Sequence, residues 1–289
     1  MITYYLIAPL LFLLSKLPTN ALYRLADVLA FFLRVVFHYR QEVVYKNLRN
    51  SFPNKSEEEI QQIAKESYTH LADRIVENIR CIGMSREEAD QRIIIKNPEV
   101  ITDLYNQGRH VVIIVGHIGA WEFNVYKLSA LTKHELFGLV SRVKNPYFNR
   151  MIQRTRGRMG MNLVYTQESK AFFNREFTRP SLTTFIADQS PSNKLKAYWT
   201  TFLNQPTAFF TGPEGFAKLR NAAVFYAHEV QIRRGYFEAE FIPITYSPNE
   251  TAPNEITEKF ARLMEKTITQ YPSDWLWSHK RWKHKKEAV

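Results

Sequence analysis

The sequence predicts an α/β fold in which a mostly parallel central sheet is flanked by helices. Three short apolar runs, at 111–115, 136–140 and 182–187, have the length and the residue types of buried strands. Segments with helical spacing of apolar residues, or with helical capping signals, lie between them. When strands alternate with helices along a chain, each helix crosses over the sheet and returns the next strand in parallel.

One stretch, His110–Glu122, carries the strongest functional signal, and it reads H-V-V-I-I-V-G-H-I-G-A-W-E. Its five consecutive apolar residues predict a buried strand that ends at a glycine, and 120–131 has helical character. His117 therefore lies in the turn between a strand and a helix, where open α/β sheets bind ligands. From the first helical turn, the carboxylate of Glu122 can reach back to the imidazole, fix its tautomer and raise its basicity. A purely structural alternative is a histidine that caps the helix and a glutamate that the helix dipole stabilises.

The other two predicted strands also end in polar residues. The second is followed by Arg142, and the third is followed by Asp188 and Gln189. If the strands are parallel, their carboxyl ends share one edge of the sheet, so that His117, Arg142 and Asp188 gather there. A base, a cation and a carboxylate in one place indicate an active site. Taken singly, Arg142 could be a surface cation and Asp188 could cap a turn.

Two regions are expected, an N-terminal membrane-associated helical segment at 1–50 and a catalytic domain at 51–289. Residues 2–14 are almost wholly apolar, and a second apolar block at 22–37 is interrupted by charged residues. A membrane span needs roughly twenty apolar residues, so these hydrophobic helices are expected to lie in the membrane surface or dip into it. The alternative is a helical hairpin packed on the protein's own core. The formal net charge of +11 predicts attraction to an anionic surface without identifying it.

The clearest helix is expected at 54–82. Ser56 and Glu59 form a capping box at its start, and apolar residues follow at helical spacing. Cys81, near its end, is the single cysteine of the chain, which excludes an internal disulfide and suits a cytoplasm-facing protein. A free cysteine in such a pattern is expected to be a buried structural thiol.

Three tryptophans and five lysine or arginine residues lie between Trp275 and Lys286. Aromatic rings beside cations favour a lipid–water interface. The same residues could bind nucleic acid through stacking and phosphate neutralisation, but no nucleic-acid-binding module is recognisable, so no nucleic acid is expected as a partner. No metal is expected either, because no second histidine at helical spacing accompanies His117 and Glu122.

Six motifs occur in order along the chain. They are G-H-I-G-A-W-E (116–122), S-R-V-K-N-P (141–146), R-T-R-G-R (154–158), A-D-Q (187–189), T-G-P-E (211–214) and W-L-W-S-H-K-R-W-K (275–283). Together they resemble the motifs of the late lipid A acyltransferases, which are lauroyl- and myristoyltransferases within the lysophospholipid acyltransferase superfamily. The resemblance covers nearly the whole chain, including the hydrophobic N-terminus.

The resemblance implies a glycerol-phosphate acyltransferase-like fold, with 51–289 as the acyltransferase domain. It implies transfer of a fatty acyl group from acyl carrier protein, or from acyl-CoA, to a hydroxyl of a lipid A precursor. The reaction would take place at the cytoplasmic face of the bacterial inner membrane, with membrane lipids as further partners and without a cofactor. His117 and Glu122 match the family's catalytic motif of a histidine, four residues and an acid. The residues expected to bind substrate are Arg142, Arg156, Arg158, Asp188 and Gln189.

The chemistry of the residues agrees with this reaction. Making an ester from a thioester and an alcohol requires removal of the hydroxyl proton, and an imidazole with a pKa near neutrality suits that task. Glu122 would orient His117 and stabilise its imidazolium form. Backbone N–H groups after His117, or an arginine, would stabilise the oxyanion, and the arginines suit acceptor phosphates. Two alternatives stay open, an acyltransferase for a lysophospholipid or an amino-acid lipid, and a non-catalytic basic protein that binds membrane surfaces.

Overall fold

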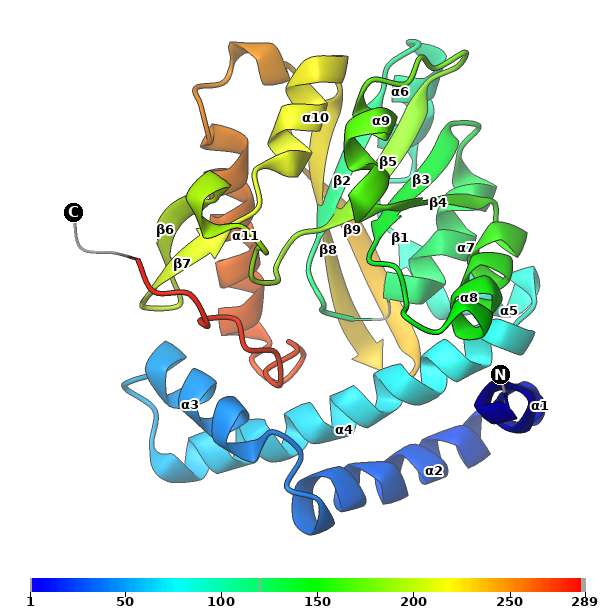
Figure 1. Ribbon diagram of the computed structural model, residues 1–289, viewed down its shortest axis with the longest axis vertical. Helices are drawn as coiled ribbons and strands as arrows, with labels where there is room; N and C mark the ends of the chain where they lie inside the picture. Colours follow the sequence, from blue (N-terminus) through cyan, green and yellow to red (C-terminus); the bar gives the residue numbers. More distant parts are fainter. Residues whose placement is uncertain (1, 120, 287–289) are drawn as a thin grey trace.

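A seven-stranded sheet forms the centre of the protein, and helices cover both of its faces (Figure 1). The computed structural model describes residues 2–119 and 121–286. The strand order is β1-β9-β8-β2-β5-β3-β4, and every neighbouring pair is parallel except β8 and β9. The strands are β1 (Ile93–Ile95), β2 (Val111–Val115), β3 (Glu135–Val140), β4 (Met161–Tyr165), β5 (Ser181–Ile186), β8 (Ala223–Arg233) and β9 (Tyr236–Thr245). A separate antiparallel pair consists of β6 (Tyr198–Phe202) and β7 (Gln205–Phe209).

The three strands predicted from the apolar runs lie side by side, which confirms the expected sheet. β2 pairs in parallel with β5, and β5 pairs in parallel with β3. All five residues of β2 are buried, which accounts for its uninterrupted apolar sequence. The carboxyl ends of the three strands therefore share one edge of the sheet, as the sequence predicted.

Alternate residues of β2 point into two different cores. Val112 and Ile114 pack with α9, α10 and α11 on one face, whereas Ile113 packs with α5, α6 and α7 on the other. The helices around the sheet are α5 (Arg86–Arg92), α6 (Glu99–Asn106), α7 (Trp121–Leu131), α8 (Pro146–Arg158), α9 (Ser169–Phe173), α10 (Gly212–Arg220) and α11 (Glu255–Gln270). Short 3-10 turns are η2 (Thr166–Glu168), η3 (Lys194–Lys196) and η4 (Pro248–Glu250).

The long helix α4 (Glu57–Gly83) crosses the carboxyl edge of the sheet (Figure 1). Its capping box is formed as predicted: the Ser56 hydroxyl accepts a hydrogen bond from the backbone of Glu59, whose carboxylate accepts one from the backbone of Ser56. Cys81 is buried near its carboxyl end, which confirms the expected structural position. The helix thus forms one wall of the region in which the strands end.

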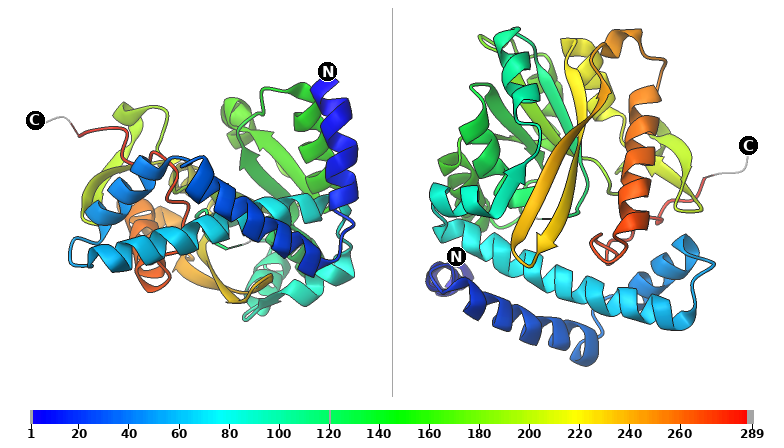
Figure 2. Two further views of the ribbon diagram at one scale, coloured as in Figure 1. Left: turned by 90° about the horizontal axis from the view of Figure 1, so that it is seen from below. Right: turned by 180° about the vertical axis from the view of Figure 1, so that it is seen from behind.

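The N-terminal helices lie outside α4 (Figure 2). They are α1 (Ile2–Leu14), α2 (Thr19–Phe31), the π-helical segment η1 (Phe32–Val36) and α3 (Gln41–Ser51). One side of α2 packs on α4 through Leu22 and Ala26, whereas Leu25, Val28 and Phe31 remain exposed. In the part of the chain that the structure describes, no helix is both long enough and apolar enough to cross a bilayer.

Candidate active site

His117 and Asp188 meet where β2 and β5 end. The Nδ1 atom of His117 lies 2.7 Å from Oδ1 of Asp188, and the backbone N–H of His117 donates to Oδ2 over 3.0 Å. The indole N–H of Trp275 donates to the same Oδ2 over 2.9 Å. A buried carboxylate is thus hydrogen-bonded through both of its oxygens, and it fixes the imidazole at the carboxyl edge of the sheet. The predicted proximity of His117 and Asp188 is confirmed.

The two groups stabilise each other's charged form. Burial acts to raise the pKa of Asp188, but the charge of His117 and the hydrogen bonds from His117 and Trp275 outweigh it and lower that pKa to about 2. Burial likewise acts to lower the pKa of His117, but the charge and hydrogen bond of Asp188 raise it above its usual value. Glu122 adds a smaller electrostatic contribution in the same direction. His117 is therefore a stronger base than a free imidazole.

The hydrogen bonds also indicate which nitrogen of His117 carries the proton. Because Nδ1 faces an ionised carboxylate, it is assigned the proton, and Nε2 is then the unprotonated ring nitrogen. The side-chain nitrogen of Gln189 lies 3.2 Å from Nε2 and can donate to it. Gln189, which the resemblance implied to bind substrate, thus contacts the atom at which a proton would be accepted.

Glu122 has a different partner from the one the sequence suggested. Arg156 of α8 binds it with two parallel hydrogen bonds, Nε to Oε2 over 2.8 Å and Nη2 to Oε1. The orienting bond to Nδ1 of His117 comes instead from Asp188. The physical reason is topological: the strand next to β2 places Asp188 beside the imidazole, while the long side chain of Arg156 reaches Glu122 from a neighbouring helix.

The two other predicted arginines have separate contacts. Arg142 is 54% exposed in its side chain; it forms an ion pair with Glu168 at 2.7 Å and lies over the ring of Tyr165. Arg158 donates from Nη2 to the backbone oxygens of Cys81 and Ile82, at 3.1 and 3.0 Å. Arg158 therefore caps the carboxyl end of α4, where free carbonyl groups need donors. Of the three predicted arginines, Arg156 is the one that binds Glu122, which adds to the basicity of His117.

An apolar cavity, here called the inner chamber, lies between the sheet and α7. Its volume is about 60 Å³, and Glu122 and Arg156 form its polar end. Gly138 lies in its wall, where a Cβ atom would come within 2.7 Å of the sulfur of Met161. The rest of the lining is predominantly apolar: Ile95, Ile113, Val115, Leu128, Leu139, Val140, Met161, Thr184, Ile186, Ala227, Ala239 and Phe241.

Two glycines allow the turn that carries His117. A Cβ atom on Gly116 would come within 2.6 Å of the methyl group of Met264, and one on Gly119 would meet the carboxylate of Glu229. Gly119 also has φ of +66°, a conformation that other residues adopt with strain. The backbone conformation at Gly119 therefore favours glycine, whereas a side chain at position 116 would require the end of Met264 to shift.

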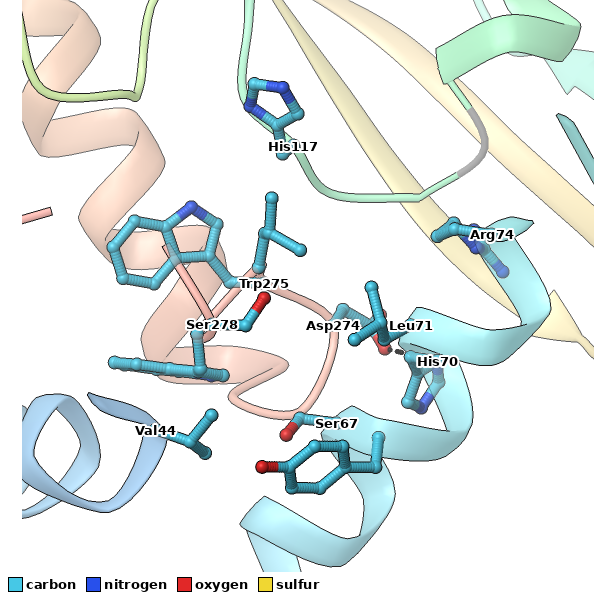
Figure 3. A pocket seen from close by; sticks show the side chains of 12 residues that line it. Val44, Ser67, His70, Leu71, Arg74, His117, Asp274, Trp275 and Ser278 are labelled. Carbon is cyan, nitrogen blue, oxygen red and sulfur yellow. Dashed lines mark ion pairs between the residues drawn. The ribbon is translucent and has the colours of Figure 1, made fainter. Parts of the chain in front are cut away.

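The C-terminal segment packs on the site rather than presenting aromatic rings to a lipid–water interface. Trp275 and Trp277 are only 3% and 1% exposed, so the interfacial interpretation of these tryptophans was wrong. Trp275 is buried because its indole N–H donates a hydrogen bond to the buried carboxylate of Asp188. Trp275 and Trp277 also line a pocket between this segment and α4, to which His117 contributes (Figure 3).

Sequence reasoning missed His279 within this segment. Its Nε2 accepts the backbone N–H of Ser190 over 3.2 Å, and burial followed by nearby positive charges lowers the pKa of His279 to about 4. His279 therefore stays neutral and anchors the loop that follows Asp188. Its only sequence signal was membership of the C-terminal motif. Among the described residues, no three His, Cys, Asp or Glu side chains are grouped to hold a metal ion.

Comparison with known proteins identifies the family to which this chain belongs. A family model described as bacterial lipid A biosynthesis acyltransferase matches residues 1–284. The chain is also similar to the lipid A biosynthesis lauroyltransferase of Escherichia coli (strain K12), with 21% identity over 290 residues that cover 96% of this chain and 90% of the relative. The resemblance seen in the motifs is thereby confirmed, and because the family match spans almost the whole chain, the protein belongs to the bacterial lipid A biosynthesis acyltransferase family.

Proposed function

We propose that this O-acyltransferase transfers a fatty acyl group from acyl carrier protein, or from acyl-CoA, to a hydroxyl of a lipid A precursor. The observation that carries the proposal is the contact of Asp188 with Nδ1 of His117 at 2.7 Å. It leaves Nε2 as a base of raised pKa at the edge of the sheet. A general base of this kind is what attack by an alcohol on a thioester requires.

In the proposed mechanism, the acceptor hydroxyl replaces the amide of Gln189 as the partner of Nε2. His117 takes the hydroxyl proton while the oxygen forms a bond to the thioester carbonyl carbon. Asp188 stabilises the resulting imidazolium. When the tetrahedral intermediate collapses, the carbon–sulfur bond breaks and the imidazolium returns the proton to the thiolate. An ester and a free thiol leave, so atoms and protons balance without a covalent enzyme intermediate.

Glu122 and Arg156 are proposed to assist this step together. The charge of Glu122 adds to the basicity of His117, and its paired oxygens hold Arg156 near the strand ends. We expect Arg156 to stabilise negative charge that develops on the carbonyl oxygen, because an oriented guanidinium donates strong hydrogen bonds to oxyanions. In this scheme Glu122 acts through its charge on His117 and by positioning Arg156, whereas Asp188 orients the base.

The inner chamber is proposed to hold the transferred acyl chain. Its lining is almost entirely apolar, and its polar end is formed by Glu122 and Arg156. A fatty acyl group with its carbonyl at that end and its chain in the chamber would bury its methylenes at about 0.8 kcal/mol each. Arg142, exposed at the same edge of the sheet, is proposed to bind an acceptor phosphate in place of Glu168.

We further propose that the protein acts on the cytoplasmic face of the inner membrane. The outward sides of α1 and α2 carry exposed apolar residues; Leu6 is 71% and Leu13 is 65% exposed. An exposed apolar patch of this kind favours contact with a lipid surface, and the excess of cations favours an anionic one. The protein would then reach a lipid acceptor that stays in the bilayer.

The direct test is acyl transfer by the purified protein. Acyl carrier protein charged with a radiolabelled fatty acid is mixed with an underacylated lipid A precursor in detergent micelles, and the product is identified by mass spectrometry. Wild-type protein should form the ester, and His117→Ala protein of equal thermal stability should lose nearly all turnover. A folded His117→Ala protein with wild-type kcat would refute the mechanism. A lysophospholipid and an amino-acid lipid are assayed in parallel as competing acceptors.

A further inference from the structure

A second apolar space lies next to the inner chamber, between α1, α4 and α8. We call it the outer groove. It consists of two adjoining cavities of about 320 and 340 Å³, both partly open to solvent, which share Ile82, Met151 and Thr155 in their walls. Figure 1 shows α1 beside α8 at the end of α4. The rings of Tyr4 and Tyr147 stack at 5.4 Å and hold α1 against the start of α8.

The outer groove leads to the candidate active site. Glu122 and Arg156 line the first of its cavities, and they also form the polar end of the inner chamber. The two spaces therefore meet at one ion pair. A molecule in the outer groove would therefore have one end beside Glu122 and Arg156, the pair that is proposed to assist acyl transfer.

The lining of the outer groove indicates what it binds. Leu11, Ile79 and Ile152 give it apolar walls near the ion pair, and Arg154 lies at its far end among exposed residues. One wall is α1, whose opposite side exposes Leu6 and other apolar residues. An apolar slot with a cation at its mouth, bounded by a helix that suits a lipid surface, fits an alkyl chain on an anionic lipid.

We propose that the outer groove binds an acyl chain that the lipid acceptor already carries, with Arg154 facing the acceptor's anionic groups. This inference rests on the proposed function. The donor's acyl chain must place its carbonyl at His117 and is assigned to the inner chamber, which is enclosed by the sheet. The acceptor stays in the bilayer, and α1 is the groove wall that adjoins it. The protein would then select its acceptor by the chains already present and not only by the reacting hydroxyl.

The test fills the groove with a bulky side chain. Met151 and Thr155 line both cavities, so Met151→Trp and Thr155→Trp each shorten the space for a chain. Gln153→Trp is the matched control, because Gln153 lies on the same helix but is exposed and outside both linings. Displacing about two methylenes of a bound chain corresponds to about tenfold weaker binding. We therefore expect the KM for an underacylated lipid A precursor to rise about tenfold in the two groove variants.

Three further measurements make the test specific. The KM for the acyl donor and kcat should stay near their wild-type values, and Gln153→Trp should behave as wild type in every assay. A precursor from which the ester-linked chains have been removed should show a smaller difference between wild-type and groove-filled proteins. Thermal unfolding of all variants checks that they are folded.

Two results would overturn the inference. One is an unchanged acceptor KM in folded groove variants, and the other is a rise in the donor KM alone, which would assign the groove to the donor chain. Equilibrium binding of the same precursor in dodecyl maltoside micelles is measured in parallel. Groove-dependent binding without any acyl transfer by wild-type protein would contradict the proposed function while supporting the groove.

Discussion

At the scale of single residues, the site depends on which carboxylate contacts which base. Asp188 holds Nδ1 of His117, and Arg156 holds Glu122. Two acidic residues close to one histidine therefore have different roles, one by direct hydrogen bonding and the other mainly by charge. Substitutions of these residues should separate the two roles, because they change either the orientation of the base or its electrostatic environment.

Asp188→Asn should lower the activity strongly, although asparagine has nearly the same shape as aspartate. Asparagine cannot stabilise the imidazolium, so kcat/KM should fall by about 10²–10⁴. Because Asp188 raises the pKa of His117, its neutralisation should lower that pKa and move the acid limb of the pH–rate profile to lower pH. Profiles of kcat/KM from pH 5 to pH 9 would show this. An unchanged rate and an unchanged acid limb in a folded Asp188→Asn protein would exclude Asp188 as the orienting residue.

Arg156→Gln should lose both activity and stability. Removing one partner of a well-buried ion pair costs about 3–5 kcal/mol, and because this pair keeps some exposure we expect about 1–3 kcal/mol. Arg142→Gln is the matched control: its pair with Glu168 is half exposed, so its unfolding free energy should change by less than about 1 kcal/mol. Denaturant unfolding measures both. Equal destabilisation by the two substitutions would show that the Arg156–Glu122 pair stabilises the fold no more than the exposed Arg142–Glu168 pair does.

At the scale of elements, the packing of α2 on α4 contains an unusual buried acid. The hydroxyl of Tyr23 donates to Glu77 over 2.7 Å, and Arg74 pairs with the same carboxylate at 2.9 Å. Burial raises the pKa of Glu77 to about 7, and Arg74 and the Tyr23 hydrogen bond only partly offset it. This contact connects an N-terminal helix to the wall of the active site through a group that titrates near neutrality.

The sign of the resulting pH effect follows from the raised pKa. The folded protein binds the Glu77 proton more tightly than the unfolded chain does, so this group stabilises the fold below about pH 4.5, the ordinary pKa of a glutamate. The stabilisation is lost as the pH rises towards about 7. Glu77→Gln mimics the protonated form, so its melting temperature should fall less between pH 5.5 and pH 8 than that of the wild type. Parallel falls in the two proteins would contradict this assignment.

At the scale of the whole molecule, the exposed apolar residues are concentrated on α1, α2 and η1. We expect full-length protein to pellet with anionic vesicles even in high salt, because apolar insertion is not screened by ions. Deleting residues 1–37 should make the remaining attachment salt-sensitive, provided the rest folds.

A subtler variant avoids the deletion. Replacing Leu6, Leu10 and Leu13 by serine should release the protein into the supernatant at high salt, because these exposed residues lie together on α1. Replacing three exposed apolar residues elsewhere by serine is the matched control and should leave binding unchanged; they are Leu195, Leu219 and Ile232. Full-length wild-type protein that stays soluble beside vesicles at low salt would contradict the membrane proposal.

The sequence by itself determined the parallel strands and the position of His117. Uninterrupted apolar runs identify buried strands because both faces of a parallel sheet are covered, and a glycine after such a run marks the turn. Asp188 follows another such run, so parallel pairing of the two strands predicted that it lies close to His117. These features depend on local patterns and on one topological rule, so one sequence was enough to predict them.

Only the tertiary structure decided which residues touch. Asp188 and Glu122 both had access to His117 in principle, and the adjacency of β2 and β5 selected Asp188. Arg158 donates to backbone oxygens at the end of α4, and Trp275 donates to Asp188 from a buried position. Residues distant in sequence are brought together by packing, and side-chain reach across elements has no sequence period. The inner chamber and the outer groove likewise exist only where separate helices and strands fail to fill the space between them.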